Sequence, residues 1–572
     1  MPNKLSNNPS PYLQQHKDNP VHWQIWSKDS FDLAKKLKKP ILLSIGYASC
    51  HWCHVMAHES FEDNETANLM NEKFINIKVD REERPDIDFV FQSSFQLFNQ
   101  TSGGWPLTMF LDENGVPFMG GTYFPKIETA GLPSFKNVIK KVNEIYIDQR
   151  DKILNQSNLI KQSLELKKNA VIKQEYEPIL EKLISNLDPL KGGFKGSPKF
   201  PTFNIYDTLI YFYNKKKDEN YLKPVELILK KLCSQGIYDH VEGGIARYTV
   251  DENWLIPHFE KMLYDNVQFI LLICRYLKTD NNKYFKKKAK QTINFLNSNF
   301  LNEDSNLLGS AFDADSEGEE GKYYVYKFKE IKHIKGIENF FDIDEKGNWE
   351  GKIILREIKP SPQEIIDELL KIRNKRKKPF FDSKTQLDLN SLWVSSLVFA
   401  HSVMPNEGYL EKAEKYLSSI DNKFCKTSLF HSYSKEIVFI EDYAYYIQAL
   451  IDLADATMEL KYKIKAKEIY MEAKTKFLNE EKNIFQKNQL TSNDLFVCPI
   501  DISDNTIPNG NSIMLLNLTR LGLFKEAKIL ADSLNGYLNN YKMNMISSIK
   551  SLDFYNEIKL GKKCNEEGCT IE

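Results

Sequence analysis

The chain has 572 residues, of which 42% are hydrophobic and 27% charged, a composition typical of globular proteins. Its length exceeds that of one ordinary domain, so we expect at least two domains. The 77 Lys and Arg residues balance 78 Asp and Glu residues to a formal net charge of −1, and no apolar run approaches the roughly 18 residues of a membrane span, so neither nucleic acid nor membrane is an expected partner.

The beginning of the chain is polar. It carries Pro9 and Pro11 without the apolar stretch of a secretory signal, so we expect a cytoplasmic protein. Eight cysteines are too few for a disulfide scaffold in a chain of this length. In a reducing compartment, a close pair of cysteines indicates redox chemistry or metal binding. Two such pairs are Cys50/Cys53 and Cys564/Cys569.

Residues 1–168 mix the periodicities of strands and helices. An amphipathic run at 31–37 precedes a short apolar run at 41–45, and further strand-like runs follow at 74–79, 106–111 and 116–118. The stretch 55–70, between the first two strands, has a helical pattern. Strands that alternate with helices indicate an α/β domain built on a sheet.

From residue 169 onward the pattern is helical almost throughout. About a dozen amphipathic segments form consecutive hairpins, and their spacing is too uneven for a short solenoid repeat. We therefore predict an all-α domain at 169–572, a closed (α/α)6 ring of six hairpins, with the domain boundary near Lys168. The segments begin near Glu177, Phe203, Tyr221, His258, Tyr284, Gln363, Leu389, Tyr409, Glu441, Lys463, Asn511 and Leu523.

The strongest chemical motif is Cys50-His51-Trp52-Cys53-His54, which follows the predicted strand 41–45 and precedes the predicted helix. This order places Cys50 at a helix N-terminus, where unpaired N–H groups stabilise a thiolate. Cys50 is then the nucleophile and Cys53 the resolving thiol. A cation at His51 favours the reduced thiolate form and makes the pair more oxidising.

The same motif has three alternative interpretations. It matches the C-x-x-C-H pattern of covalent haem attachment, although that chemistry normally takes place outside the cytoplasm. Cys50, Cys53, His54 and His58 have the residue types of a zinc site, but they are crowded into one and a half helical turns. The two cysteines could also be buried structural thiols. We expect no metal and no cofactor.

Three loops of the helical region, at 192–201, 238–257 and 310–326, are rich in acidic and aromatic residues. Carboxylates and imidazoles hydrogen-bond sugar hydroxyls, and aromatic rings cover sugar C–H faces, so the loops indicate a carbohydrate-type pocket. His258 is a candidate general acid or base, with a structural histidine as the alternative. The acidic run from Asp313 to Glu320 could instead be a solvated loop or a cation site, although it lacks the spacing of a calcium loop.

Several blocks resemble one known family in the same order along nearly the whole chain. They include Asn19-Pro20-Val21-His22-Trp23, the Cys50 motif, the block from Val79 to Asp88, Gly104-Trp105-Pro106 and Gly121-Thr122-Tyr123-Phe124-Pro125. They are similar to the YyaL-like family, also called the spermatogenesis-associated thioredoxin-domain family. The resemblance implies a thioredoxin-like α/β domain, in which Pro106 is cis and faces the dithiol, followed by an N-acylglucosamine 2-epimerase-like, six-hairpin glycosidase-like toroid.

This resemblance leads to three functional hypotheses: a thiol–disulfide oxidoreductase, a sugar epimerase or glycoside hydrolase-like enzyme, and a non-catalytic binding scaffold. The corresponding partners are a disulfide-bearing protein and a sugar-like small molecule. One departure is Ile245-Ala246-Arg247-Tyr248, where the family usually has a histidine that could serve as a second acid or base. The candidate catalytic residues are Cys50, Cys53, His258 and Glu260, and the candidate substrate-binding residues are His51, Trp52, Pro106, Arg247, Tyr248, Trp254, Asp265, Asp313, Asp315, Glu317 and Asp442.

The pair Cys564/Cys569 resembles a C-terminal cysteine pair of the family. It could exchange with the Cys50/Cys53 disulfide, complete a metal site or be an inert pair.

Overall fold

The computed structural model describes residues 2–129, 131–167, 175–426, 428–561, 563–565 and 568–570, the last two segments without their side chains. The chain separates into two compact units. The first comprises Met1–Lys167 with Ser432–Ser434 and Gln486–Ile500, and the second comprises Lys168–His431, Lys435–Phe485 and Asp501–Glu572. Both short segments lie beyond the predicted boundary near Lys168 and are grouped with the first unit.

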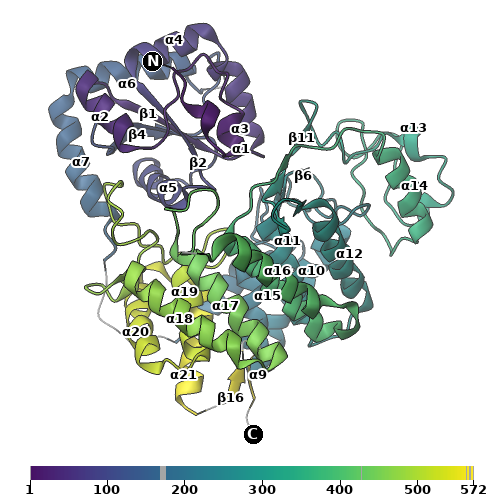
Figure 1. The fold of residues 1–572 in the computed structure, drawn as a ribbon. Coiled ribbons are helices and arrows are strands. Elements are labelled where there is room, and N and C mark those ends of the chain that lie inside the picture. Colours follow the sequence, from purple (N-terminus) through teal and green to yellow (C-terminus); the bar gives the residue numbers. More distant parts are fainter. Residues whose placement is uncertain are drawn as a thin grey trace. The chain divides into compact units, whose positions relative to one another are not determined.

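The first unit is built on a mixed sheet (Figure 1) with strand order β2-β1-β3-β4, of which the picture labels β1, β2 and β4. Strands β1 (Ile41–Gly46) and β2 (Ile75–Asp80) are parallel. Strands β3 (Leu107–Leu111) and β4 (Pro117–Gly121) continue the sheet in antiparallel pairing. The first three strands are buried along their whole length, and β1 and β3 accordingly read as apolar runs. The alternation of β2 is typical of a half-buried strand, but its polar side chains are buried as well. This is the thioredoxin-like α/β domain that the sequence predicts.

Helices cover both faces of this sheet. One face packs a core of Ile, Leu, Val, Phe and Met side chains from the strands against α2 and α5. The predicted helix 55–70 is interrupted, because a π-helical turn at Ala57–Phe61 follows α3 and the Asp63 carboxylate then accepts the Thr66 N–H to start α4. The helices of this unit are α1 (Pro11–Gln14), α2 (Lys28–Leu37), α3 (His51–Met56), α4 (Asn64–Lys73), α5 (Pro85–Asn99), α6 (Phe135–Asp148) and α7 (Arg150–Leu164).

The segment Gln486–Ile500 joins the first unit through apolar and charged contacts. The Phe496 ring lies 6.0 Å from that of Phe91 on α5. The Asp494 carboxylate accepts hydrogen bonds from the Trp26 indole at 3.1 Å and the Arg84 guanidinium at 2.7 Å. A stretch nearly 400 residues away along the chain therefore completes this core.

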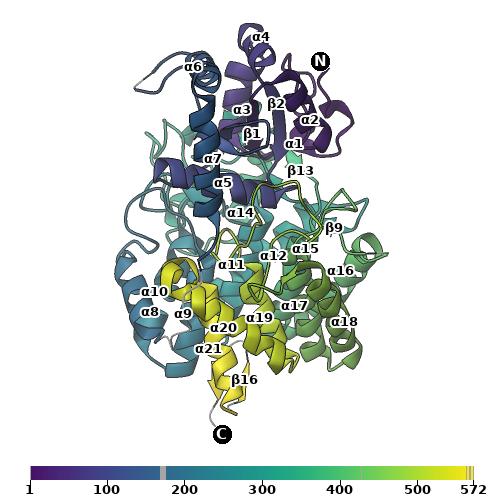
Figure 2. The same ribbon diagram turned by 90° about the vertical axis from the view of Figure 1, so that its left-hand side faces the viewer.

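In the second unit, within the described residues, six helices close a ring in which each contacts the next and the last contacts the first. Figure 2 labels the helices of this ring. Outer helices alternate with them along the chain, which gives the predicted (α/α)6 toroid. The ring consists of α9 (Phe203–Lys216), α11 (Leu263–Leu277), α15 (Leu387–Val403), α17 (Ile440–Thr457), α19 (Gly510–Arg520) and α21 (Ile546–Lys559), and the other long helices are α8 (Glu177–Asn186), α10 (Glu219–Ser234), α12 (Lys283–Asn299), α16 (Tyr409–Phe424), α18 (Leu460–Phe477) and α20 (Phe524–Tyr541).

Two helices differ from the prediction. The segment near Gln363 forms α14 (Gln363–Arg373), which lies in an insertion between α12 and α15 together with the short α13 (Phe328–Ile331). The ring is instead completed by α21, which the amphipathic pattern did not reveal. His258 lies in a short strand, and the following helix starts only at Leu263.

Because each outer helix runs back along its neighbours, the inner helices are parallel and their N-termini lie at one end of the ring. Asp504, in the loop before α19, links three of these ends. Its carboxylate accepts hydrogen bonds from the Asn204 side chain at 3.2 Å, from Asn509 at 2.9 Å and from the Ser547 N–H at 2.7 Å.

Short strands occupy the loops of the second unit. They are β5 (Tyr248–Thr249), β6 (Pro257–His258), β7 (Lys261–Met262), β8 (Leu301–Asn302), β9 (Leu307–Leu308), β10 (Ala311–Phe312), β11 (Asp315–Ser316), β12 (Glu319–Glu320), β13 (Phe381–Asp382), β14 (Leu478–Asn479) and β15 (Ile484–Phe485). Near the C-terminus, β16 (Lys563–Asn565) pairs with β17 (Gly568–Thr570), with Cys564 opposite Cys569. The side chains of this second cysteine pair lie outside the described part, as does the predicted boundary at Lys168. Within the described residues, no helix combines the length and apolar character that a membrane crossing requires.

Candidate functional site

The Cys50 motif lies at the end of β1. Cys50 is the N-cap residue of α3, and its sulfur accepts the Cys53 N–H at 3.2 Å. The two cysteines form a disulfide, with their Cα atoms 5.2 Å apart. Cys50 is 3% exposed and Cys53 1% exposed. The N–H group of Cys53 can stabilise a Cys50 thiolate once the disulfide is reduced.

An exposed aromatic surface adjoins the disulfide in sequence. Trp52 is 47% exposed and packs between His51 and Tyr123, with ring centroids 5.5 and 5.1 Å away. The Tyr123 hydroxyl donates to Glu59 at 2.6 Å, which fixes its ring. His51 and Trp52, both predicted to bind substrate, therefore sit where a partner protein could contact them.

The peptide bond between Trp105 and Pro106 is cis, as the family resemblance implied, and Pro106 is buried. The Trp105 indole donates to Asp88 at 2.9 Å, and the Arg81 guanidinium lies 3.9 Å above its ring. Burial raises the pKa of Asp88, while Arg81 and the indole N–H act in the opposite direction. This network holds the backbone just before Pro106.

The zinc and haem interpretations both require free sulfurs. In this structure the two sulfurs are bonded to each other. His58 is exposed and its Nδ1 pairs with Glu62 at 3.0 Å. Neither interpretation is therefore supported by the disulfide form.

The interior behind the disulfide contains a buried amine. Lys78, on β2, is 1% exposed, and its Nζ donates to Ser44 at 3.1 Å. The Nζ lies 4.5 to 5.0 Å from the ring centroids of Phe61, Tyr12 and Trp23. Burial lowers the pKa of Lys78 well below its ordinary value. The three rings supply the cation–π contacts that partly replace water around this amine.

In the toroid, His258 is held between two carboxylates. Its Nε2 lies 2.7 Å from Glu260 and its Nδ1 2.7 Å from Glu320 on β12. Burial lowers the pKa of His258, but the two carboxylates outweigh it and raise the pKa to about 9. His258 is therefore an imidazolium at neutral pH with both ring nitrogens engaged, a state suited to fixing charge and not to accepting a proton.

Arg247 and Tyr248 join this cluster. The Arg247 guanidinium lies 3.6 Å from the Glu260 carboxylate. The Tyr248 ring stacks on His258 at 4.9 Å and on Phe200 at 4.7 Å. The structure thus brings together four predicted residues from positions 247–260 of the chain.

The acidic run forms a hairpin of β11 and β12. Asp313 is buried, and its carboxylate accepts the Asp315 N–H at 3.1 Å. Asp315 is half-buried, whereas Glu317 is exposed at the tip and pairs with Lys322 at 3.0 Å. The three predicted carboxylates therefore have different surroundings.

Two further predicted residues lie near the pocket loops. Trp254 is fully buried, and its indole N–H donates to the Lys191 carbonyl at 2.9 Å. Its ring packs in the core in this structure and exposes no face to a ligand, unlike a residue that binds substrate through its ring. Asp265 is 7% exposed and lies in the first turn of α11, at the end of the ring where the inner helices begin.

Asp442 belongs to a cluster that the sequence did not reveal. The His431 Nδ1 lies 2.8 Å from the Asp442 carboxylate, and the Asp388 N–H donates to the same oxygen at 3.3 Å. All three side chains are buried, in the first turns of α15 and α17 and the loop between α16 and α17. Burial and the Asp442 charge raise the pKa of Asp388 to about 7 even though His431 opposes them.

This cluster could also hold a metal. One ligand atom from each of Asp388, His431 and Asp442 lies within 4.8 Å of the others, and within the described residues no other group of His, Cys, Asp or Glu side chains has this spacing. Two carboxylates and an imidazole suit Zn²⁺ or Mn²⁺. As an alternative to metal binding, the same three groups can transfer a proton.

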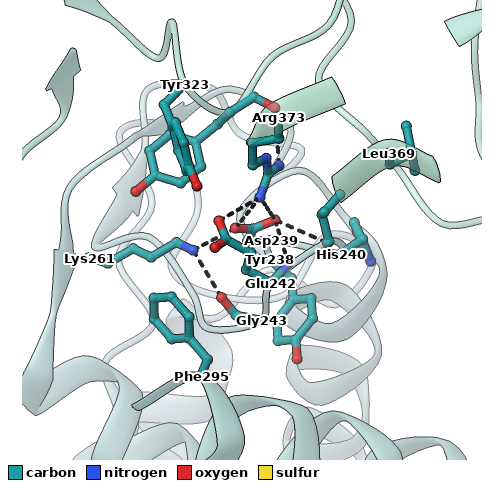
Figure 3. Close-up of polar contacts among 12 residues, drawn as sticks. Tyr238, Asp239, His240, Glu242, Gly243, Lys261, Phe295, Tyr323, Leu369 and Arg373 are labelled. Carbon is teal, nitrogen blue, oxygen red and sulfur yellow. Dashed lines mark hydrogen bonds and ion pairs between the residues drawn. The ribbon is translucent and has the colours of Figure 1, made fainter. Parts of the chain in front are cut away.

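A third set of charges anchors the insertion (Figure 3). The Arg373 guanidinium, at the end of α14, donates to both oxygens of Asp239 at 2.8 Å and to Glu242 at 3.3 Å. Lys261 donates to Asp239 at 2.6 Å and to the Gly243 carbonyl at 2.9 Å. Two buried cations thus neutralise two carboxylates.

Sequence reasoning missed Glu320, Asp388 and His431. Glu320 lies within an acidic run, and only the hairpin register directs it at His258. Asp388 and His431 are isolated in the sequence. The one local signal concerns Asp388, which lies at the start of an apolar helix, a position that favours a carboxylate.

The chain is similar to a known protein family and to several solved structures. The family described as "Thioredox_DsbH: Protein of unknown function, DUF255" matches residues 2–165. Among solved structures, cellobiose 2-epimerase from Bacillus thermoamylovorans B4167 covers 64% of this chain and 86% of its own, with 13% identity and a TM-score of 0.43. D-mannose isomerase covers 64% and 84%, with 12% identity and a TM-score of 0.40.

Two relatives match most of the chain. Uncharacterized protein B0495.5 of Caenorhabditis elegans is 31% identical over 589 residues, which cover 91% of this chain and 80% of the relative. Human spermatogenesis-associated protein 20 is 30% identical over 535 residues, which cover 80% of this chain and 68% of the relative. The chain belongs to the spermatogenesis-associated protein 20 family.

Proposed function

We propose that the first unit is a thiol–disulfide oxidoreductase that acts on disulfide-bearing proteins in the cytoplasm. The observation that carries this proposal is the Cys50–Cys53 disulfide at the start of α3, with the Cys53 N–H directed at the Cys50 sulfur. The exposed Trp52 ring beside it offers an apolar contact for a polypeptide.

The exchange proceeds in two displacement steps. The Cys50 thiolate attacks one sulfur of the substrate disulfide, forms a mixed disulfide and releases one substrate thiolate. The Cys53 thiolate then attacks the Cys50 sulfur and releases the second. Two electrons pass from the protein dithiol to the substrate, and the two thiol protons end on the substrate sulfurs.

The test is insulin reduction with dithiothreitol as the terminal reductant. We expect Cys50→Ser to lower turnover to the rate of dithiothreitol alone, because the attacking thiolate is missing. Cys498→Ser is the matched control, since it removes an exposed cysteine of the same unit and should leave turnover unchanged. Undiminished activity of Cys50→Ser would rule out the proposal.

We propose a second function for the toroid: acid–base chemistry on a sugar-like molecule at Asp388, His431 and Asp442. The supporting observation is the difference between the two histidine sites. His258 has both nitrogens bound to carboxylates, whereas His431 has one carboxylate at Nδ1 and Gln386 3.3 Å from its Nε2. A carboxylate at Nδ1 fixes the tautomer that leaves Nε2 as the acceptor.

A panel of free mono- and disaccharides, followed by proton NMR in D₂O, tests this second function. We expect wild-type protein to epimerise or hydrolyse at least one sugar, His431→Asn to lose this turnover, and Cys50→Ser to retain it. In His258→Gln, retained turnover supports His431 as the base, and lost turnover returns that role to His258. An inactive wild type contradicts the proposal and leaves a binding scaffold.

A further inference from the structure

The Tyr12 hydroxyl is a buried polar group without a hydrogen bond. Tyr12, on α1, is 0% exposed, and within the described residues its oxygen has no partner. A buried hydroxyl left unpaired costs about 1–3 kcal/mol, so most such groups in proteins are paired. A second state of the protein in which the hydroxyl is used is one explanation for such a group.

Gly46 locates this hydroxyl beside the disulfide. A Cβ added at Gly46, the last residue of β1, would lie 2.3 Å from the Tyr12 oxygen and 2.7 Å from the Cys53 sulfur. Both atoms therefore pack against the same α-carbon. Any side chain at this position would displace them, which gives a reason for glycine at the end of a buried strand.

The neighbouring polar groups leave the hydroxyl free for the sulfur. Ser44 and Gly46 pair in register with Lys78 and Asp80. The Lys78 amine donates to Ser44 and lies over the face of the Tyr12 ring, 4.9 Å from its centroid, and not at its oxygen. The Asp80 carboxylate accepts the Ser10 hydroxyl at 2.6 Å and the Glu82 N–H at 2.9 Å.

We propose that the Tyr12 hydroxyl is the hydrogen-bond donor to the Cys53 sulfur in the reduced protein. This inference deepens the proposed redox function and rests on it. In the disulfide, the sulfur is a poor acceptor. When an external dithiol supplies two electrons, the S–S bond breaks, two protons enter, and the Cys53 sulfur becomes a thiol or thiolate that accepts the phenolic hydrogen.

The consequence is a preference for the reduced state. The oxidised protein contains an unpaired buried hydroxyl, and the reduced protein pairs it. Tyr12 therefore favours reduction and lowers the free energy of the Cys53 thiolate that must attack the mixed disulfide. It acts as a positioning residue behind the dithiol, because the substrate contacts Cys50.

Tyr12→Phe tests the proposal, since it removes the oxygen and keeps the ring. In equilibrium with reduced and oxidised glutathione, we expect the constant for reduction of the Cys50–Cys53 disulfide to fall about tenfold, a shift of about 30 mV to more negative potential. Thermal unfolding should show the oxidised variant at least as stable as wild type and the reduced variant less stable than wild type.

Tyr146→Phe is the matched control. Its hydroxyl donates to Glu113 at 2.7 Å, away from the dithiol, so its loss should affect both redox forms equally and leave the potential unchanged. An unchanged potential in Tyr12→Phe, or equal stability changes in its two forms, would overturn the inference. The titration follows the protein's own disulfide. A wild type that titrates reversibly but reduces no insulin contradicts only the proposed activity.

Discussion

Replacing Arg373 with Met should destabilise the helical unit by about 3–5 kcal/mol, because it leaves buried carboxylates without their main partner. Arg373 is 2% exposed and holds both oxygens of Asp239 as well as Glu242 (Figure 3). Burial alone would raise the pKa of Asp239, but Arg373 and Lys261 together hold it well below its ordinary value. In the variant, Lys261 and the Val241 and Glu242 N–H groups are left to oppose the desolvation of Asp239.

Urea unfolding of the full chain, followed by far-UV circular dichroism, measures this loss. Lys371→Met on the same helix is the control, because its pair with Glu368 is exposed and should contribute less than about 1 kcal/mol. Adding Asp239→Asn to the Arg373→Met variant should recover part of the stability, because the unpaired charge is then gone. A midpoint of Arg373→Met equal to that of Lys371→Met would show that the network is not important for stability.

The sheet of the first unit was predictable because its strands carry their own signal. Residues 41–45 and 74–79 read as strands, and β1 and β2 begin and end within one residue of these limits. The helix predicted at 55–70 is broken by a cap at Asp63, a local feature that a hydrophobic pattern averages away.

The ring helices were harder to delimit because both sides of them are buried. α21 buries Ser547, Lys550 and Asp553 along with its apolar residues, so it lacks the polar outer face that marks an amphipathic helix. Hydrogen bonds from α9 explain the polar content: Tyr211 and Lys215 donate to Asp553 at 2.9 and 2.8 Å. The amphipathic pattern reveals α14 instead, because α14 is a surface helix of the insertion.

The two candidate sites also differ in how far the sequence alone reveals them. Cys50 and Cys53 are close in sequence and form a site that local reasoning can find. Asp388, His431 and Asp442 come together only when α15 and α17 pack side by side, so their proximity is a property of the ring. Trp254 shows the converse error, because an aromatic residue in a polar loop can belong to the core.

The carboxylates at the end of the ring where the inner helices begin share a physical reason for their position. Inner helices present their unpaired N–H groups at this end, and carboxylates are stabilised near such groups. Asp265, Asp388 and Asp442 all lie in first turns. A closed ring thus gathers carboxylates from distant positions without any local motif, and the repulsion between Asp388 and Asp442 favours protonation of Asp388 or binding of a cation.

Asp388→Asn should therefore change how stability depends on pH. The pKa of Asp388 is about 7 in the folded protein, against about 3.9 for an unfolded chain. The folded state therefore binds this proton more tightly than the unfolded state. The contribution of the proton to the free energy of unfolding is complete below about pH 4 and is lost as pH rises towards 7, by at most about 1.4 kcal/mol per pH unit. Asparagine cannot ionise, so the variant should gain stability relative to wild type between about pH 5 and about pH 8.

The measurement is the urea midpoint of Asp388→Asn and of wild type at these two pH values, with a chelator present. The difference in stability between the two proteins is then compared between the two pH values. Asp532→Asn on α20 is the control, because Asp532 is exposed and should show no such trend. A constant difference between Asp388→Asn and wild type would contradict a raised Asp388 pKa. Repeating the measurement at the higher pH with Mn²⁺ or Zn²⁺ separates the two uses of the cluster: a bound cation would keep Asp388 ionised and stabilise wild type more than the variant.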